Sequence, residues 1–435
     1  MRIANALTAS FLLFIPPAIS LANHAPVLGF EASEHVAAGD TVSLRFRAGE
    51  PAVNGYVFTL PNGLKLTYGQ LVSMGDFYEI PGEPLTTSPS DEVKKARFLK
   101  SFGSLAQNTT ALDEAPKIIA VIQSERDAVD QGIKEGKKAE EVFAAIDNDN
   151  NRQWNCITGG DCSSSWWLRE GRYLALVKQD VDHFGLNAWS TYEIGHLLAI
   201  QTAIEAHTTQ DQHKLEYAYA INAFASHFLS DRFASGHMRT PRVELPATVT
   251  PSLVGALLTH FMHIEENKYG LHVHNLRGDH WVAFGDGNYF DASNAQSNQL
   301  MQETLQASAD DIFTAYLTGA APAADSAYAL IPFPDEIKTA ANQDISPLFY
   351  WDDETQQMMR RTDVANVHDN HWTSNWWGWT TLALLATQTP LPPSSQAELI
   401  QAGFASESVQ YGVITDKKFI SKVQHAMQSK NHTGT

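Results

Sequence analysis

The stretch from Trp189 to Leu229 constrains the fold more than any other part of the sequence. It contains no Pro, a single Gly, and many Ala, Leu, His and Tyr residues, with a polar segment from Thr208 to His213. Pro and Gly weaken a helix interior most, so a long stretch nearly free of both favours helix. The apolar composition and the polar break predict two long, largely buried helices. We therefore expect a mainly α-helical protein with these two helices at its centre.

Other segments show the periods of strands or helices. Apolar and polar residues alternate over residues 35–62, which predicts a small β-rich start to the mature chain. A second alternation, over residues 271–290, predicts a short hairpin inserted between helices. Helical periods are found in residues 64–74, in residues 117–146 with interruptions near Gly132 and Gly136, and in Ser252–Asn267.

Residues 1–22 have the pattern of a secretory signal peptide. Arg2 carries the only charge before an apolar run over residues 7–19, and small residues lead to a cleavage point near Ala22. A buried N-terminal helix is the alternative, but Pro16-Pro17 would interrupt it. We expect the mature protein to be secreted or periplasmic. No later stretch approaches the roughly 20 apolar residues of a membrane-spanning helix, so it is also expected to be soluble.

The chain is acidic, with 49 Asp and Glu against 30 Lys and Arg and a formal net charge of −19. Removal of residues 1–22 would take away Arg2 alone and leave 29 − 49 = −20. Nucleic-acid grooves and lipid-binding basic surfaces both depend on Lys and Arg that neutralise phosphates. The charge therefore argues against a nucleic-acid partner and against electrostatic binding to anionic lipid.

Cys156 and Cys162 are the only cysteines, and the segment between them includes Gly159 and Gly160. In an oxidising compartment this spacing favours one small-loop disulfide. Half of a structural zinc site is the alternative, and it would need two further ligands nearby. We expect the disulfide.

His227, Asp231 and His237 form the strongest local signal, a His-x3-Asp-x5-His pattern. His227 and Asp231 are one helical turn apart, so their side chains point the same way, and Gly236 permits a bend that returns His237 toward them. Two imidazoles and a carboxylate suit Zn²⁺ in a protein whose thiols are paired. The alternative is three unrelated polar residues, one of them a hydrogen-bonded core histidine.

Other ligand-type residues lie in separate segments that apolar residues flank. His183 precedes the first long helix, and Asp76 lies at a helix end. Downstream, one helix carries His260, His263, Glu266 and Asn267 at spacings that share a face. Burial of so many His and Asp without partners would be costly, and metal ions would neutralise them. The segments therefore indicate more than one metal ion, whereas His196 is expected to be a hydrogen-bonded core residue.

The whole set of separated Asp and His residues resembles the zinc-dependent phospholipases C. Several strings resemble, more specifically, the gammaproteobacterial branch of phosphatidylcholine-hydrolysing phospholipases C. These strings are Leu66–Gln70, Gly75–Tyr78, Cys156–Gly160, Gly171–Leu174, Asp182–Gly185 and His227–Arg242. The resemblance covers roughly residues 56–290. It implies an all-α fold that holds three zinc ions and that fungal single-strand nucleases share.

The resemblance also implies which residues bind zinc. One ion would be held by Asp76, His183, His227 and Asp231, with Asp231 bridging to a neighbouring metal. A second ion would be held by His237, His263 and an acid of the same helix. The family's usual carboxylate position falls on Asn267, so Glu266 is our substitute.

A third zinc ion would be bound by the mature N-terminal residue and a downstream histidine. In this chain Asn23 or His24 and His35 could supply those ligands, although His35 opens the segment expected to be β-rich. We therefore expect two or three Zn²⁺ ions.

The resemblance implies hydrolysis of the glycerol-side phosphodiester bond, with diacylglycerol and a phosphorylated head group as products. Asp76 is the candidate that holds and deprotonates the attacking water. Arg239 and Arg242 follow His237 and are candidates for phosphate contact, with surface arginines in a loop as the alternative.

Residues 23–330 are expected to form the catalytic domain, and residues 331–435 a Trp-rich segment that completes or flanks it. The tryptophans of this segment are Trp351, Trp372, Trp376, Trp377 and Trp379. Trp favours membrane interfaces and the faces of quaternary ammonium groups, which would suit a choline lipid. Core packing of a final helix is the alternative.

We expect a secreted zinc phospholipase C that acts on phosphatidylcholine at a phospholipid surface, with no nucleic-acid partner and no obligate protein partner. A zinc-dependent single-strand nuclease and a non-catalytic, zinc-stabilised binding protein are the alternatives. The charge of the mature chain would repel a polyanionic substrate but not a zwitterionic head group.

Overall fold

The computed structural model describes residues 31–164, 166, 169–335 and 345–389. Within these residues the protein is mainly α-helical with small antiparallel sheets, which confirms the predicted fold class. The expected signal peptide lies outside the described residues, as do Asn23 and His24. The proposed domain boundaries stay predictions. No helix in the described ranges has both the length and the apolar character that crossing a bilayer requires.

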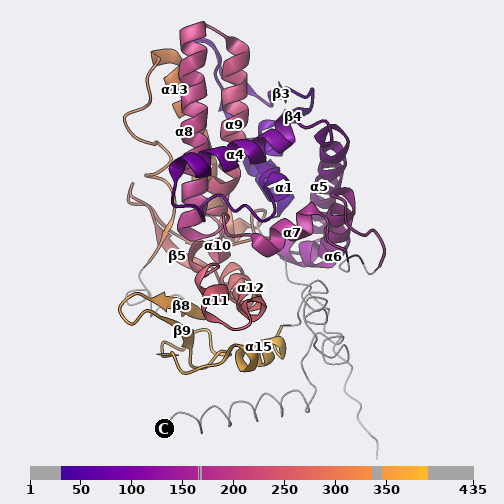
Figure 1. Cartoon of the computed structure of the whole chain (residues 1–435), viewed down its shortest axis with the longest axis vertical. Helices are drawn as coiled ribbons and strands as arrows, with labels where there is room; N and C mark the ends of the chain where they lie inside the picture. Colours follow the sequence, from indigo (N-terminus) through magenta and orange to yellow (C-terminus); the bar gives the residue numbers. More distant parts are fainter. Residues whose placement is uncertain (1–30, 165, 167–168, 336–344, 390–435) are drawn as a thin grey trace, which may run out of the picture.

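Long helices form the centre of the molecule: α8 (Gly185–Thr209), α9 (Gln212–Asp231) and α13 (Ala295–Thr318), the last preceded by the 3-10 turn η2 (Ala292–Asn294). α8, α9 and α13 pack against one another, with α8 and α9 side by side in Figure 1. Gln210 ends α8 in a left-handed conformation, and the Asp211 carboxylate caps α9 by accepting hydrogen bonds from backbone N–H groups. The two predicted long helices and the polar turn between them are confirmed.

The N-terminal part begins with a helix, α1 (Ala32–Gly39), so the expected strand pattern is wrong for residues 35–39. Glu31 and Glu34 form a capping box that satisfies backbone N–H groups of the first turn and favours helix there. The predicted strands appear only after it, as two short pairs. These are β1 (Ser43–Leu44) with β2 (Val53–Asn54), and β3 (Val57–Thr59) with β4 (Lys65–Thr67).

The short helix expected from residue 64 begins later, because residues 65–67 pair with β3. Thr67 then caps α2 (Tyr68–Ser73), and α3 (Gly75–Tyr78) follows directly. α2 packs against α1 and α9, so this segment joins the N-terminal part to the central helices.

Four further helices complete the first half of the chain. They are α4 (Asp91–Ala106), α5 (Ala111–Lys134), α6 (Ala139–Ile157) and α7 (Arg172–Gln179). α5 and α6 pack together on one side of the molecule, as Figure 1 shows, and confirm the predicted helix pair. The predicted disulfide between Cys156, in the last turn of α6, and Cys162 is also confirmed.

The second half leads from the central helices to a hairpin. Its helices are α10 (Ser235–Arg239), α11 (Glu244–Thr248) and α12 (Ser252–Tyr269). β5 (Leu271–His274) and β6 (His280–Ala283) then form the predicted hairpin, and β7 (Phe333–Pro334) pairs with the other edge of β5.

A separate apolar cluster joins α11 and α12 to the C-terminal elements β8 (Phe349–Asp352), β9 (Gln357–Arg361) and α15 (Gly378–Ala386). β10 (Trp372–Thr373) pairs with β9. Trp379 is buried in this cluster, and the indole N–H of Trp376 donates to the carbonyl of Met358. The buried Arg361 guanidinium forms two hydrogen bonds to Glu265 at 2.7 and 2.8 Å. Within the described residues, these tryptophans pack the core, which is the alternative interpretation of the Trp-rich segment.

Gly195 provides a test of the central packing. An added Cβ would lie 2.3 Å from Cζ of Phe98 on α4 and 2.6 Å from Cβ of Ala225 on α9. We expect Gly195→Ala to lower the free energy of unfolding by about 1–3 kcal/mol, because overpacking displaces the helices. In the control Gly103→Ala on α4, the new Cβ meets nothing closer than 3.8 Å, so a gain of about 0.5–1 kcal/mol is expected. Denaturant unfolding measures both, and a Gly195→Ala variant as stable as the parent would contradict the packing.

Candidate metal centre

The His-x3-Asp-x5-His residues meet at the end of α9. His227 and Asp231 lie in its last two turns and are almost completely buried. The chain turns after Asp231 into α10, and Nδ1 of His237 comes to 3.8 Å from Oδ1 of Asp231. The role of Gly236 differs from the predicted bend. An added Cβ would lie 2.6 Å from the carbonyl oxygen of His263, so glycine is needed for the close approach of α12.

Asp76 and His183 approach the same point from α3 and from the segment before α8. Nε2 of His227 lies 3.4 Å from Oδ1 of Asp76 and 2.9 Å from Nδ1 of His183. Nδ1 of His183 lies 2.9 Å from Oδ2 of Asp231. Gly75 permits the approach of α3, because a Cβ there would lie 2.2 Å from the His227 ring. The predicted set of Asp76, His183, His227 and Asp231 is therefore brought together.

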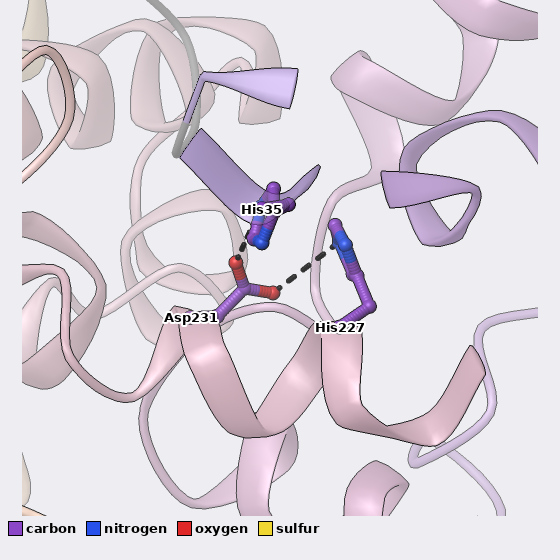
Figure 2. Close-up of side chains that lie close together, drawn as sticks. All are labelled: His35, His227 and Asp231. Carbon is purple, nitrogen blue, oxygen red and sulfur yellow. Dashed lines mark ion pairs between the residues drawn. The ribbon is translucent and has the colours of Figure 1, made fainter. Parts of the chain in front are cut away.

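His35 joins this set from α1, as Figure 2 shows. Its Nε2 lies 3.6 Å from Oδ1 of Asp231, and its ring lies 4.3 Å from the His227 ring, measured between centroids, at an angle of 39°. Nδ1 of His35 is 2.8 Å from Oγ of Ser230, which holds the ring in place. His35 thus reaches the centre from a helix rather than from the expected strand. We call His35, Asp76, His183, His227 and Asp231 the Asp231 cluster.

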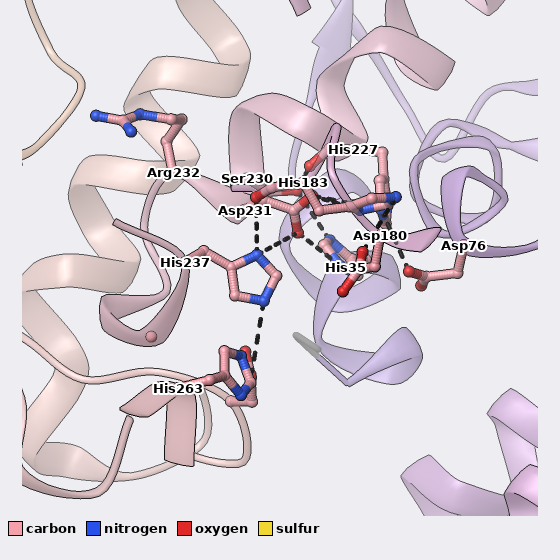
Figure 3. A network of polar contacts seen from close by, with 12 residues as sticks. His35, Asp76, Asp180, His183, His227, Ser230, Asp231, Arg232, His237 and His263 are labelled. Carbon is pink, nitrogen blue, oxygen red and sulfur yellow. Dashed lines mark hydrogen bonds and ion pairs between the residues drawn. The ribbon is translucent and has the colours of Figure 1, made fainter. Parts of the chain in front are cut away.

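His237, His263 and Asp286 form a neighbouring group, which we call the His263 group. Nε2 of His263 lies 2.9 Å and Nε2 of His237 lies 3.9 Å from Oδ2 of Asp286. Nδ1 of His237 donates to the backbone carbonyl of His183 at 2.9 Å, so the opposite ring nitrogen faces the group. Figure 3 shows His237 between Asp231 and His263, which places the two sets next to each other.

The assignment of Glu266 as the acid partner of His263 is corrected to Asp286. The buried Glu266 carboxylate accepts a hydrogen bond from Nε of Arg239 at 2.6 Å. Glu266 is therefore paired with Arg239. Asn267, one turn after His263, donates from Nδ2 to Oδ2 of Asp286 at 2.5 Å. The chain thus supplies its carboxylate from the loop after β6, and Asn267 orients it.

The expected phosphate contacts of Arg239 and Arg242 are also corrected. Besides Glu266, Arg239 donates to the carbonyl of Ile345. Arg242 donates to Oγ1 of Thr259 at 2.6 Å and to the carbonyl of Val177 at 3.0 Å. Both guanidinium groups therefore connect elements of the fold.

Burial and charge make the Asp231 cluster suited to cations. Burial opposes ionisation of Asp231, but the imidazoles of His227 and His183 outweigh it and hold the pKa of the carboxyl well below its usual range. Burial and the charge of His227 lower the pKa of His35 to about 3, so its imidazole is neutral and able to act as a ligand.

Several buried ligand-type atoms at the centre have no hydrogen-bond partner among the described residues. They are Nδ1 of His227, Oδ1 of Asp231, Nε2 of His237, Nδ1 of His263 and Oδ1 of Asp286. Buried polar atoms without partners are costly, and bound metal ions would give some of these atoms a partner.

A small pocket of about 30 Å³ lies beside the Asp231 cluster. Asp76, His183 and His237 line it on the metal side. Carboxylates and aromatic rings line the rest, among them Glu31, Asp147, Asp180, Trp154 and Tyr173. Burial and the charge of Glu125 raise the pKa of Asp147 to about 7.

Sequence reasoning missed Asp286 and the carboxylates of the pocket. Asp286 had one visible signal, because it lies between Gly285 and Gly287 directly after the predicted hairpin. Asp147 lies inside α6, where nothing in the local sequence marks it as part of a pocket.

Comparisons of the chain with family models, curated proteins and solved structures found no match. The chemistry of the centre therefore has to follow from its own residues. In the described residues, several groups of three His and Asp side chains, most of them buried, have ligand-type atoms within 4.8 Å of one another. Such groups can hold metal ions.

Exchange of Asp286 tests the corrected ligand assignment. We expect Asp286→Asn to lower the number of metal ions retained per chain by one, because the His263 group loses its carboxylate. Glu266→Gln is the control on the adjacent helix, and it should keep the wild-type number although it weakens the ion pair with Arg239. Elemental mass spectrometry of the purified proteins measures both numbers. Loss of a metal ion in Glu266→Gln alone would restore the original assignment.

Proposed function

We propose that the protein is a secreted, zinc-dependent phospholipase C that cleaves the glycerol-side phosphodiester bond of phosphatidylcholine. The products would be diacylglycerol and a phosphorylated head group. The observation that carries the proposal is the convergence of the Asp231 cluster from α1, α3, α9 and the segment before α8, beside an acidic and aromatic pocket. The resemblance of the sequence to zinc phospholipases C supports the same function.

The donor atoms fit Zn²⁺. They are imidazole nitrogens and carboxylate oxygens, and both cysteines are paired in the disulfide. Asp231 directs Oδ2 toward His183 and Oδ1 toward His35, so its carboxylate is placed to serve two ions. Together with the His263 group, these ligand sets support the proposal of two or three ions. When bound, zinc ions lower the pKa of water and neutralise phosphate oxygens.

Asp76 is the carboxylate placed to handle the attacking water. Its side chain is 25% exposed and lines the pocket, whereas the side chain of Asp231 is 1% exposed. Burial opposes ionisation of Asp76, but His227 outweighs it and lowers the pKa of the carboxyl. The ionised carboxylate can accept a hydrogen bond from water at the mouth of the centre.

The residues that line the pocket support the binding of a lipid with a cationic head group. Quaternary ammonium groups bind to carboxylates and to the faces of aromatic rings, and both kinds of side chain are present. The same carboxylates would repel the repeated phosphates of a nucleic acid. Phosphatidylcholine, with one phosphate and one fixed positive charge, matches this lining better than a polyanion does.

Loss of Asp76 tests the proposed reaction. We expect the zinc-loaded protein to hydrolyse phosphatidylcholine and a chelator to abolish the activity. Asp76→Asn should lower kcat/KM by about 100-fold or more, the contribution usual for a positioned acid or base. Asp113→Asn, at a 76% exposed side chain on α5, is the matched surface control and should keep full activity.

Single-stranded DNA is the second substrate in this assay. Hydrolysis of DNA but not lipid would replace the proposal with a nuclease. Hydrolysis of neither, with a melting temperature that the chelator still lowers, would indicate a zinc-stabilised binding protein.

Replacement of a carboxylate that lines the pocket tests the proposed preference for a cationic head group. We expect Asp147→Asn to raise KM for phosphatidylcholine several-fold with little change in kcat, because it removes a carboxylate that faces the ammonium group. KM for phosphatidylglycerol, which carries no cation, should not rise. Asp149→Asn is the control, since Asp149 is 61% exposed and pairs with Arg152. An equal rise in KM for both lipids would show that Asp147 has no part in head-group choice.

A further inference from the structure

One imidazole and two carboxylates form a second polar group outside the candidate metal centre. His196 comes from α8, Asp311 from α13 and Asp325 from the segment after α13. Their ligand-type atoms lie within 4.8 Å of one another, and none of the three residues belongs to the Asp231 cluster or the His263 group. His196 is 1% exposed and Asp311 4%, whereas Asp325 is partly exposed.

The hydrogen bonds of His196 direct a lone pair toward the carboxylates. Nδ1 of His196 lies 2.7 Å from Oδ1 of Asn222. The amide nitrogen of Asn222 donates to the hydroxyl groups of Tyr68 and Ser308, so its oxygen is the acceptor and Nδ1 of His196 the donor. The expected core hydrogen bond of His196 is thus present. It leaves Nε2 as the ring nitrogen that faces the carboxylates, the arrangement usual for a metal-binding histidine.

Two ligand-type atoms of this group have no hydrogen-bond partner among the described residues. Nε2 of His196 and Oδ2 of Asp325 have no hydrogen-bond partner in the part of the chain that the structure describes. Nε2 lies 3.7 Å from Oδ2 of Asp311. Tetrahedral zinc with bonds of about 2.0–2.2 Å separates its ligand atoms by about 3.3 Å, so a small adjustment would admit the ion.

The surroundings fix the carboxylates and add negative charge. Asp311 accepts hydrogen bonds from the backbone N–H and the hydroxyl group of Ser326 at 2.8 and 2.6 Å. Asp325 accepts one from the backbone N–H of Ala327 through Oδ1, which leaves Oδ2 toward the group. Burial and the charge of Asp325 raise the pKa of Glu193, one turn before His196. Carboxylates therefore outnumber imidazoles here, and a cation would balance them.

We propose that His196, Asp311 and Asp325 bind a divalent cation of the zinc class at a structural site that ties α8 to α13 and the segment after it. Imidazole nitrogen with carboxylate oxygens suits Zn²⁺, and water would complete the coordination. Because Asp325 is partly exposed, the site is accessible to solvent at this residue. The proposal does not depend on the phospholipase activity.

Zinc stoichiometry of Asp325→Asn tests this site. The full protein is stripped with a chelator, reloaded with ZnCl2, desalted and analysed by elemental mass spectrometry. We expect the variant to hold one zinc ion fewer than the wild type and to lose part of the zinc-dependent rise in melting temperature. Asp310→Asn, at the residue of α13 before Asp311, is the control, because Asp310 accepts a hydrogen bond from Gln306 and lies outside the group. It should keep the wild-type count.

Equal zinc counts in Asp325→Asn and the wild type would overturn the proposal. An ion pair with protonated His196 would give that result, together with a drop in melting temperature that is the same with and without zinc. Asp311→Asn gives a second measurement of the same loss. Failure of the proposed phospholipase activity would leave these counts interpretable, because they need no substrate.

Discussion

The buried carboxylate of Asp231 is the group on which the arrangement of the surrounding elements depends. Its Oδ2 lies 2.9 Å from Nδ1 of His183 and 3.5 Å from Nε2 of His227. Its Oδ1 lies 3.6 Å from Nε2 of His35 and 3.8 Å from Nδ1 of His237. Removal of an ionised carboxylate from water costs several kcal/mol unless partners compensate it. The approach of α1, α10 and the segment before α8 to the end of α9 supplies those partners.

α9 also organises the residues behind the ligands. Asn222, Ser226 and Ser230 are spaced one turn apart, so they form a polar stripe along the buried C-terminal part of the helix. Their side chains bond, in turn, to His196 on α8, Tyr68 on α2 and His35 on α1. One stripe therefore orients histidines of both the Asp231 cluster and the proposed structural site. A change in the stripe would alter both sites without touching a metal ligand.

The parts that the sequence could predict are those set by local spacing. His227 and Asp231 share a helix face whatever the tertiary structure, and the Pro-free stretch around them could only be helical. Asp286 was missed because its role depends on the path of the hairpin after α12. The alternation over residues 35–62 predicts a strand at the start of α1, but the capping residues Glu31 and Glu34 favour a helix there. The polar stripe was missed because an isolated Ser in a helix has no period of its own.

α1 holds two parts of the centre at once. It supplies His35 directly. Glu34, the residue before His35 in α1, accepts hydrogen bonds from the backbone N–H groups of Gly287 at 3.1 Å and Tyr289 at 2.8 Å. These bonds fix the loop that carries Asp286, which Asn267 orients from the other side. The position of the Asp286 carboxylate is therefore stabilised from both α1 and α12. Because Glu34 and His35 are adjacent, a displacement of α1 would move ligands of the Asp231 cluster and the His263 group together.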